Sequence, residues 1–154
     1  MQRKDGQMYA PVGKANVVCQ PGEFTVGVIG LDHGHIYGMC NGLVEAGAIV
    51  THVWDSSQER IASFVKAFPS AQVASSVQSL YDDPSIDLIA TAAIPSDRAS
   101  IIVQALQSGK HVFADKPAMT TLDQLKAVRS AVETSKKSFA VYFSERLHVE
   151  AATY

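Results

Sequence analysis

From residue 24 onward, short and continuously apolar runs such as VGVI and LIATAA alternate with longer, helix-like stretches. The short runs are rich in residues that favour strands, and Gly or Pro closes several of the longer ones. The expected strands are Thr25–Ile29, Ile49–Trp54, Gln72–Ala74, Leu88–Ala92, His111–Ala114 and Phe139–Phe143. The expected helices are Ile36–Ala46, Gln58–Phe68, Ser76–Tyr81, Ser96–Ser108 and Thr121–Ser135.

Strands that alternate with helices in this way indicate βαβ units and a parallel sheet. Strands that are apolar throughout, without a polar alternate face, fit a sheet that helices cover on both sides. We therefore predict an α/β fold: a Rossmann-like, doubly wound, mostly parallel sheet with helices on both faces and with Thr25–Ile29 near its centre. Residues 1–22 show no sustained periodicity and are expected to form an irregular leader.

Composition narrows the class of protein. The chain has 154 residues and a formal net charge of −2 without a basic cluster, which favours neither nucleic acid nor an anionic membrane as a partner. No apolar run reaches the roughly 18 residues that a membrane span requires. Cys19 and Cys40 are too few and too unpatterned for a disulfide framework, so a cytoplasmic location with free thiols is expected.

The first strand leads into the sequence GLDHGHIYG, where Gly30 is placed to make a tight turn before a helix. In a doubly wound fold this turn holds a pyrophosphate on backbone N–H groups and on the helix dipole. Asp32 and Gly34 follow Gly30, and His35 opens the helix, so the Gly-rich pattern is incomplete. The alternative is that the two glycines serve only the turn and that Asp32 caps the helix.

An acidic residue, Asp55, ends the second strand 25 residues after Gly30. A carboxylate in this position can accept hydrogen bonds from the ribose hydroxyls of an adenosine group. It would also repel a 2′-phosphate, which favours NAD over NADP. The alternative is that Asp55 caps the helix that starts near Ser57, and the two roles are compatible. Arg60 is interpreted as a solvated helix charge.

A second stretch with possible chemistry is GKHVFADKPAMT, in which a buried strand leads directly into Lys116. Ligands of open α/β sheets bind at the carboxyl ends of the strands. A lysine there can donate a hydrogen bond to a substrate oxygen or transfer a proton. The alternative is a surface turn in which Pro117 only restricts the backbone.

The histidines raise the question of a metal site, since Asp32, His33 and His35 are clustered and such groups can bind zinc. All three lie within one turn, however, and a structural zinc site takes four ligands. We therefore expect no metal and keep a zinc site as the minor alternative.

At this point the chain resembles a known family. The order of the Gly turn, the acidic residue after the second strand and the run AAIPSDRASIIVQALQSGKHVFADKP is similar to the N-terminal nucleotide-binding domain of the Gfo/Idh/MocA oxidoreductases. The resemblance covers about Phe24 to His148, and its most specific part, ALQSGKHVFADKP, resembles the pattern AL-x-AGKHV-x-x-EKP. Among the departures, Asp115 replaces a glutamate, His35 replaces a glycine or alanine, and Ser96 and Ala99 stand where Asn and His are frequent.

The resemblance implies an NAD-dependent dehydrogenase acting on a sugar, a polyol or a related small molecule. It implies that Lys116 is the catalytic residue and that the bond before Pro117 is cis. The candidate cofactor-binding residues are Gly30, Asp32, His33, Gly34, His35, Asp55, Ile94, Pro95, Asp115 and Pro117.

The resemblance also suggests how the chain is organised. Residues 23–143 are expected to form the dinucleotide-binding domain, and residues 144–154 to begin the crossing into a second domain that is absent from this sequence. In the family, that second domain supplies the substrate pocket and the contacts of a homo-oligomer, so the 154-residue chain alone is not expected to turn over substrate. The alternative is a non-catalytic Rossmann-like module that binds a nucleotide.

Overall fold

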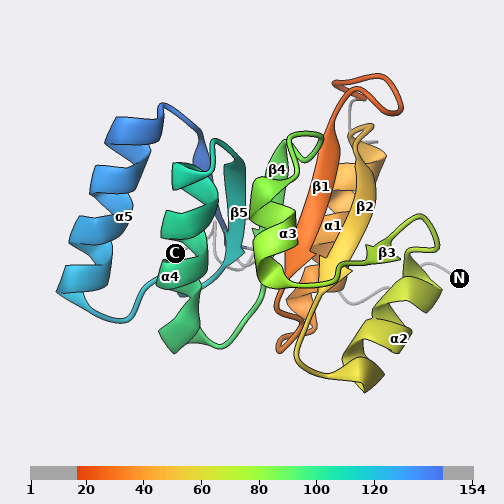
Figure 1. Cartoon of the computed structure of the whole chain (residues 1–154), viewed down its shortest axis with the longest axis horizontal. Coiled ribbons are helices and arrows are strands. Elements are labelled where there is room, and N and C mark those ends of the chain that lie inside the picture. The colour runs from red at the N-terminus through yellow and green to blue at the C-terminus, as the bar shows by residue number, and fades with distance from the viewer. Residues whose placement is uncertain (1–16, 144–154) are drawn as a thin grey trace, which may run out of the picture.

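The structure is a computed structural model that describes residues 17–143. Its strands form one six-stranded sheet in the order β3-β2-β1-β4-β5-β6, and every neighbouring pair is parallel (Figure 1). The strands are β1 (Thr25–Ile29), β2 (Ile49–Trp54), β3 (Gln72–Val73), β4 (Leu88–Thr91), β5 (His111–Asp115) and β6 (Phe139–Tyr142). The helices are α1 (His35–Glu45), α2 (Gln58–Ala67), α3 (Val77–Asp82), α4 (Pro95–Gln107) and α5 (Leu122–Ser135).

Local signals in the sequence account for the helix boundaries. The helices α2, α3 and α5 begin after Ser57, Ser76 and Thr121, whose hydroxyl oxygens accept hydrogen bonds from backbone N–H groups of the first turn. The helices α1 and α4 are followed by Gly47 and Gly109, which have the positive φ angles of 110° and 78° that glycine tolerates. Every predicted helix and strand is present, and the ends of each lie within one residue of the predicted bounds.

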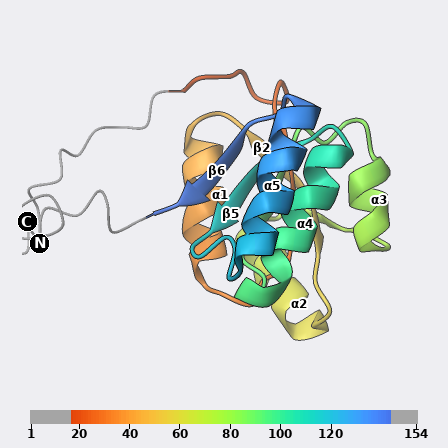
Figure 2. The same ribbon diagram turned by 90° about the vertical axis from the view of Figure 1, so that its left-hand side faces the viewer.

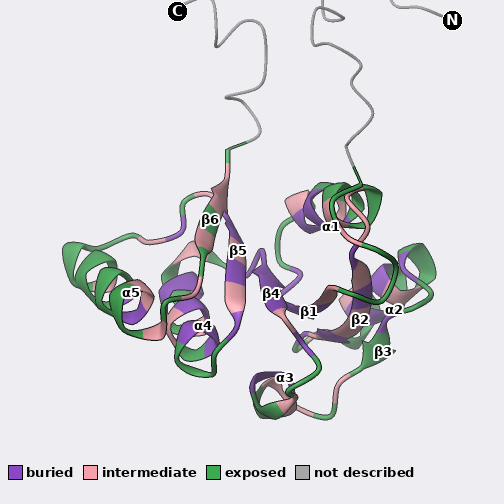
Figure 3. Cartoon of the chain, turned by 90° about the horizontal axis from the view of Figure 1, so that it is seen from above, coloured by how far each residue is buried: buried purple, intermediate pink, exposed green. Residues whose placement is uncertain are grey.

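Helices cover both faces of the sheet, as the apolar strands predicted. One core cluster joins β1 and β2 to α1 and α2, and the other joins the opposite face to α3, α4 and α5 (Figures 2 and 3). Along β1, Val26 and Val28 belong to the first cluster. Gly27 faces the second, where a Cβ atom would lie 3.1 Å from methyl carbons of both Ile86 and Ile89. The central strand is thus apolar on both sides because both sides are buried.

Two of the predicted segments fall wholly or partly outside the described residues. Residues 17–22 of the expected leader contain no helix or strand, and the Val18 N–H donates to the Ala46 carbonyl oxygen at 2.8 Å. Residues 1–16 and the expected crossing at 144–154 lie outside the part that the structure describes. None of the helices between residues 17 and 143 combines the length and the apolar character needed to cross a membrane.

Candidate functional site

Strands β2, β1, β4 and β5 lie side by side, and the turns that follow them lie together at the carboxyl edge of the sheet (Figure 1). The Gly30 N–H donates to the Trp54 carbonyl oxygen, and the Gly30 carbonyl oxygen accepts from the Ala92 N–H, each at 3.1 Å. Gly30 therefore connects the turns after three strands. All of the predicted site residues lie at this edge, since each belongs to one of these four turns or to the element end beside it.

The turn at Gly30 requires glycine for two reasons. Its φ angle is 81°, in the region that residues with a side chain rarely adopt. A Cβ atom at this position would also lie 2.6 Å from the Cβ of Ala93, far inside normal contact distance. The predicted role of Gly30 as the residue of the tight turn is therefore explained by both conformation and space.

The start of α1 has few free backbone donors. The His35 N–H donates to Nδ1 of His33 at 3.2 Å, so this donor is engaged within the turn. Across residues 17–143 we find no hydrogen bond from the N–H groups of Asp32 or Gly34. A bound phosphate could therefore accept hydrogen bonds from the N–H groups of Asp32 and Gly34 without displacing an existing acceptor.

The alternative in which Asp32 caps α1 is wrong. The N-cap residue of α1 is Gly34, and no side chain makes a capping hydrogen bond there. The carboxylate of Asp32 instead forms an ion pair with Arg60 of α2, with Oδ1 and Nη2 separated by 3.2 Å. The anion in the turn is thus balanced by a cation from the neighbouring helix.

Asp55 is buried and makes several hydrogen bonds. Its Oδ2 accepts from the Leu31 N–H at 2.6 Å, and its Oδ1 accepts from the Ser57 N–H at 2.7 Å. Oδ1 also lies 2.9 Å from Nε and 2.7 Å from Nη2 of Arg60. Asp55 therefore braces the Gly30 turn against the start of α2, where Ser57 itself is the cap.

Arg60 is partly solvated, as interpreted from the sequence, since its side chain is 39% exposed, but it is not a free charge. Its guanidinium is bound between the carboxylates of Asp55 and Asp32. The hydrogen bond to Asp55 is the main cause that raises the pKa of Arg60, and the charges of both carboxylates add to it. This part of the site therefore holds two anions and one cation.

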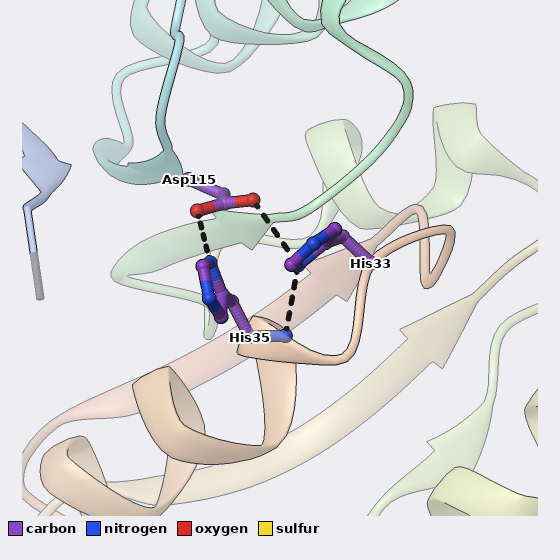
Figure 4. A group of neighbouring side chains, drawn as sticks. All are labelled: His33, His35 and Asp115. Atoms are coloured by element: carbon purple, nitrogen blue, oxygen red, sulfur yellow. Dashed lines mark hydrogen bonds and ion pairs between the residues drawn. The ribbon is translucent and has the colours of Figure 1, made fainter.

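At the end of β5, the buried carboxylate of Asp115 lies beside His33 and His35 (Figure 4), and it also pairs with Arg98 of α4. Its Oδ2 lies 2.9 Å from Nη2 of Arg98 on α4, and its Oδ1 lies 2.9 Å from Nδ1 of His35. Nδ1 of His33 is 3.6 Å from Oδ2. The Lys116 N–H donates to Oδ1 at 2.8 Å. A single carboxylate thus connects the Gly30 turn to the segment that carries the lysine.

Potential metal ligands are arranged differently from the group considered in the sequence. Asp32 pairs with Arg60, and Asp115 takes its place beside the histidines, so that His33, His35 and Asp115 offer ligand atoms within 4.8 Å of one another. The Asp115 carboxylate is already neutralised by the buried Arg98 guanidinium. A divalent cation would add a second positive centre beside it, which the local electrostatics disfavour.

Lys116 is half-buried at the carboxyl edge, and the bond between Lys116 and Pro117 is cis, as the resemblance implied. Among residues 17–143 its Nζ atom has no hydrogen bond or ion pair, so the ammonium is available to a ligand. Pro95 is the first residue of α4, and Ile94 before it is 47% exposed. The turn after β4 therefore presents an apolar side chain at the same edge as Lys116.

Arg98 was not among the residues identified from the sequence. It lies on α4 at helical spacing from Ile102 and Leu106, which are fully buried, and it is itself only 2% exposed. An arginine in the apolar stripe of a helix is the signal that was available, because such a charge has to find partners in the interior.

Comparisons with known proteins bear on this arrangement. Residues 24–143 match the family described as "Oxidoreductase family, NAD-binding Rossmann fold". Over 126 residues the chain is 33% identical to an inositol 2-dehydrogenase/D-chiro-inositol 3-dehydrogenase of Lacticaseibacillus casei, a match that covers 79% of this chain and 36% of that protein. A D-xylose dehydrogenase of Paenarthrobacter nicotinovorans is 29% identical over 44% of this chain and 18% of that protein.

Solved structures agree with the fold. A candidate oxidoreductase from Erwinia carotovora atroseptica SCRI1043 aligns with a TM-score of 0.77 and 46% identity, covering 80% of this chain and 37% of that one. A biliverdin reductase from Synechocystis sp. PCC 6803, in complex with biliverdin and NADP+, aligns with a TM-score of 0.69 and 27% identity over 80% of this chain and 39% of that one. In the three of these matches that cover most of this chain, the aligned part is little more than a third of the other protein's length.

Proposed function

The chain belongs to the Gfo/Idh/MocA oxidoreductase family and carries its NAD(P)-binding Rossmann domain, and from this premise we propose that it is the nucleotide-binding part of a dehydrogenase. The complete enzyme would move a hydride between the nicotinamide of the cofactor and a hydroxyl-bearing carbon of a sugar, a polyol or a related small molecule. The names of the inositol and xylose dehydrogenases support this substrate class. The observation that carries the proposal is the gathering of Gly30, Asp55 and Lys116 at one carboxyl edge.

Lys116 is the proposed catalytic residue. As the carbon is oxidised, the neutral amine of Lys116 would accept the proton that the hydroxyl loses. In the reverse reaction the resulting ammonium would donate this proton to the substrate oxygen. The turn after β4, with Ile94 and Pro95, would lie beside the nicotinamide. A bound dinucleotide would supply the hydride acceptor, and Lys116 and the surrounding turns would orient the substrate oxygen.

We expect NAD to be preferred over NADP. Asp55 lies at the end of β2, and its Oδ2, which accepts only from the Leu31 N–H among the described residues, would accept a further hydrogen bond from a ribose hydroxyl. The carboxylate would also repel a 2′-phosphate. Arg60 weakens this discrimination, because its guanidinium lies 2.7 Å from Oδ1 of Asp55 and offsets part of the negative charge. Asp32, His33, Gly34 and His35 would line the pyrophosphate, with the Asp32 and Gly34 N–H groups as its donors.

A second candidate function is a nucleotide-binding module without turnover. It is favoured by the small number of free donors at the start of α1, where the N–H groups of Leu31 and His35 already have acceptors. Such a module would bind a dinucleotide weakly and would not reduce it.

The proposal is tested first by calorimetric titration of the 154-residue chain with NAD, NADP and ADP. Steady-state assays with inositols and aldoses then use the full-length protein, meaning this chain joined to the proposed second domain. Dinucleotide binding by the chain together with substrate-dependent reduction of NAD by the full-length protein is the expected result. Dinucleotide binding without turnover by the full-length protein would favour the nucleotide-binding module. Absence of dinucleotide binding would exclude both the dehydrogenase and the module. We further propose a homo-oligomeric enzyme in a reducing, cytoplasmic setting, which the free Cys19 and Cys40 support.

A further inference from the structure

We propose that Arg98 is a positioning residue that fixes Lys116 relative to the turn after β4. This inference rests on the proposed role of Lys116 and adds a residue that has no expected contact with cofactor or substrate. It follows from the hydrogen bonds that the buried guanidinium makes at the end of the sheet.

The three donor nitrogens of Arg98 reach three different points of the site. Nε donates to the Ala93 carbonyl oxygen at 2.6 Å, Nη1 donates to the Pro117 carbonyl oxygen at 2.9 Å, and Nη2 donates to Oδ2 of Asp115 at 2.9 Å. Two of these acceptors belong to the residues immediately before and after Lys116. The lysine is therefore held on both sides by one rigid group.

The third acceptor connects the lysine to the proposed nicotinamide side. Ala93 lies directly before Ile94 and Pro95 in the turn after β4. Because the same planar guanidinium contacts Ala93 and both neighbours of Lys116, it sets the separation between this turn and the lysine backbone. The separation would determine where the ammonium lies relative to the ring and the reacting carbon.

Asp115 extends this connection to the first turn. Its Oδ2 pairs with Arg98, while its Oδ1 accepts from the Lys116 N–H at 2.8 Å and lies 2.9 Å from Nδ1 of His35. Arg98 thus anchors a carboxylate that in turn fixes the lysine amide and the start of α1. Loss of the guanidinium would release the acceptor on which both of these contacts depend.

Lysine cannot replace arginine in this role. The guanidinium is planar and has five N–H donors in a fixed arrangement, whereas the ammonium of lysine is a flexible point charge. Arg98→Lys would keep the positive charge near Asp115 but could not hold Ala93, Asp115 and Pro117 in one geometry. Misplacement of a reacting group by about 1 Å can reduce a rate roughly 10²-fold, so the substitution should act on catalysis.

The first test is steady-state kinetics of the full-length protein with Arg98→Lys and Arg98→Met. The same substitutions at Arg129, an exposed arginine on α5, are the matched controls. We expect Arg98→Lys to lower kcat about 10²-fold while the KM for the dinucleotide stays within about 3-fold, and the Arg129 variants to leave both constants unchanged. A kcat of Arg98→Lys within about 3-fold of the unmodified enzyme would overturn the proposal. This holds whatever Arg98→Met does, because Arg98→Met leaves the buried Asp115 without its charge partner and can reduce kcat through misfolding alone.

The second test does not depend on turnover. In the ¹⁵N-labelled 154-residue chain, the amide of Lys116 reports on its hydrogen bond to Asp115. We expect Arg98→Lys to shift this amide signal and to accelerate its hydrogen exchange at least about 10-fold, with no such change in Arg129→Lys. If the full-length protein shows no activity, the proposed function fails, and this measurement still decides whether Arg98 orders Lys116. An unchanged Lys116 amide would contradict the positioning role.

Discussion

Nδ1 of His35 lies 2.9 Å from Oδ1 of Asp115, although 80 residues separate the two in the chain. Both residues depart from the family pattern, since His35 stands in place of a small residue and Asp115 in place of a glutamate. The structure brings these departures into contact at the carboxyl edge. The shorter side chain of Asp115 is thus held by an imidazole from the first turn and a guanidinium from α4.

We predict that Gly30→Ala destabilises the domain, whereas Gly34→Ala does not. Gly30 has a φ angle of 81°, and a Cβ there would lie 2.6 Å from that of Ala93, while Gly34 has a φ angle of −61° and open space around it. The left-handed conformation costs about 1–2 kcal/mol for a residue with a side chain, and overpacking adds about 1–3 kcal/mol. Urea denaturation of the two variants measures the difference. Equal free energies of unfolding would contradict the account of this turn.

Asp55 and Arg60 should act in opposite directions on cofactor choice. Asp55→Asn keeps a similar shape but removes the charge that repels a 2′-phosphate, so the preference for NAD over NADP should narrow. Arg60→Ala removes the cation that pairs with Asp55, so the preference should widen. The ratio of the two dissociation constants, measured by calorimetry with Arg129→Ala as control, tests both. Tighter binding of NADP than of NAD by the unmodified chain would refute the role of Asp55.

Asp32→Gly is expected to tighten dinucleotide binding. Two like charges about 4 Å apart repel by about 4 kcal/mol at an effective dielectric constant of about 20, but Arg60 and solvent offset most of this for Asp32. We therefore expect a gain of a few-fold in affinity, largest at low salt. Asp123→Gly, at an exposed position of α5, should leave the affinity unchanged. Weaker binding by Asp32→Gly would mean that the carboxylate organises the turn through Arg60.

Lys116→Ala should abolish most of the turnover of the full-length protein and leave dinucleotide binding nearly intact. A general acid or base contributes about 10²–10⁴-fold to the rate, so kcat should fall by that factor. Lys126→Ala is the matched control, because Lys126 is exposed on α5 and pairs only with Asp123 among the described residues. Retention of full turnover by Lys116→Ala would exclude the lysine from the site.

The order of the elements could be predicted because each signal is local. Apolar runs, the caps at Ser57, Ser76 and Thr121, and the glycines after α1 and α4 all act within a few residues of where they occur. The parallel order of the strands then followed from the alternation of strands and helices. The tight turn at Gly30 was predicted from a local signal of the same kind and is confirmed. The cis bond before Pro117 is confirmed too, but it was implied by the resemblance to the family.

The polar partners could not be predicted in the same way, because they join residues far apart in the sequence. From the sequence, the carboxylate of Asp32 could equally be assigned to a helix cap or to a phosphate-binding turn. Its ion pair with Arg60 becomes visible only when the position of α2 is known. The pairing of Asp115 with Arg98 depends similarly on how α4 lies against β5. The packing of the helices against the sheet decides which charges pair, and the pattern of residues in one sequence carries little information about that packing.

The buried pair of Arg98 and Asp115 also has a consequence for how this protein can change over generations. Neither charge can be replaced alone without leaving the other without its ion-pair partner in the interior, which commonly costs about 3–5 kcal/mol. Loss of the charge at either position therefore passes through a poorly folded intermediate unless both positions change together. The charges at positions 98 and 115 are thus expected to be inherited as a pair, with lineages that keep the arginine also keeping an acidic residue at 115.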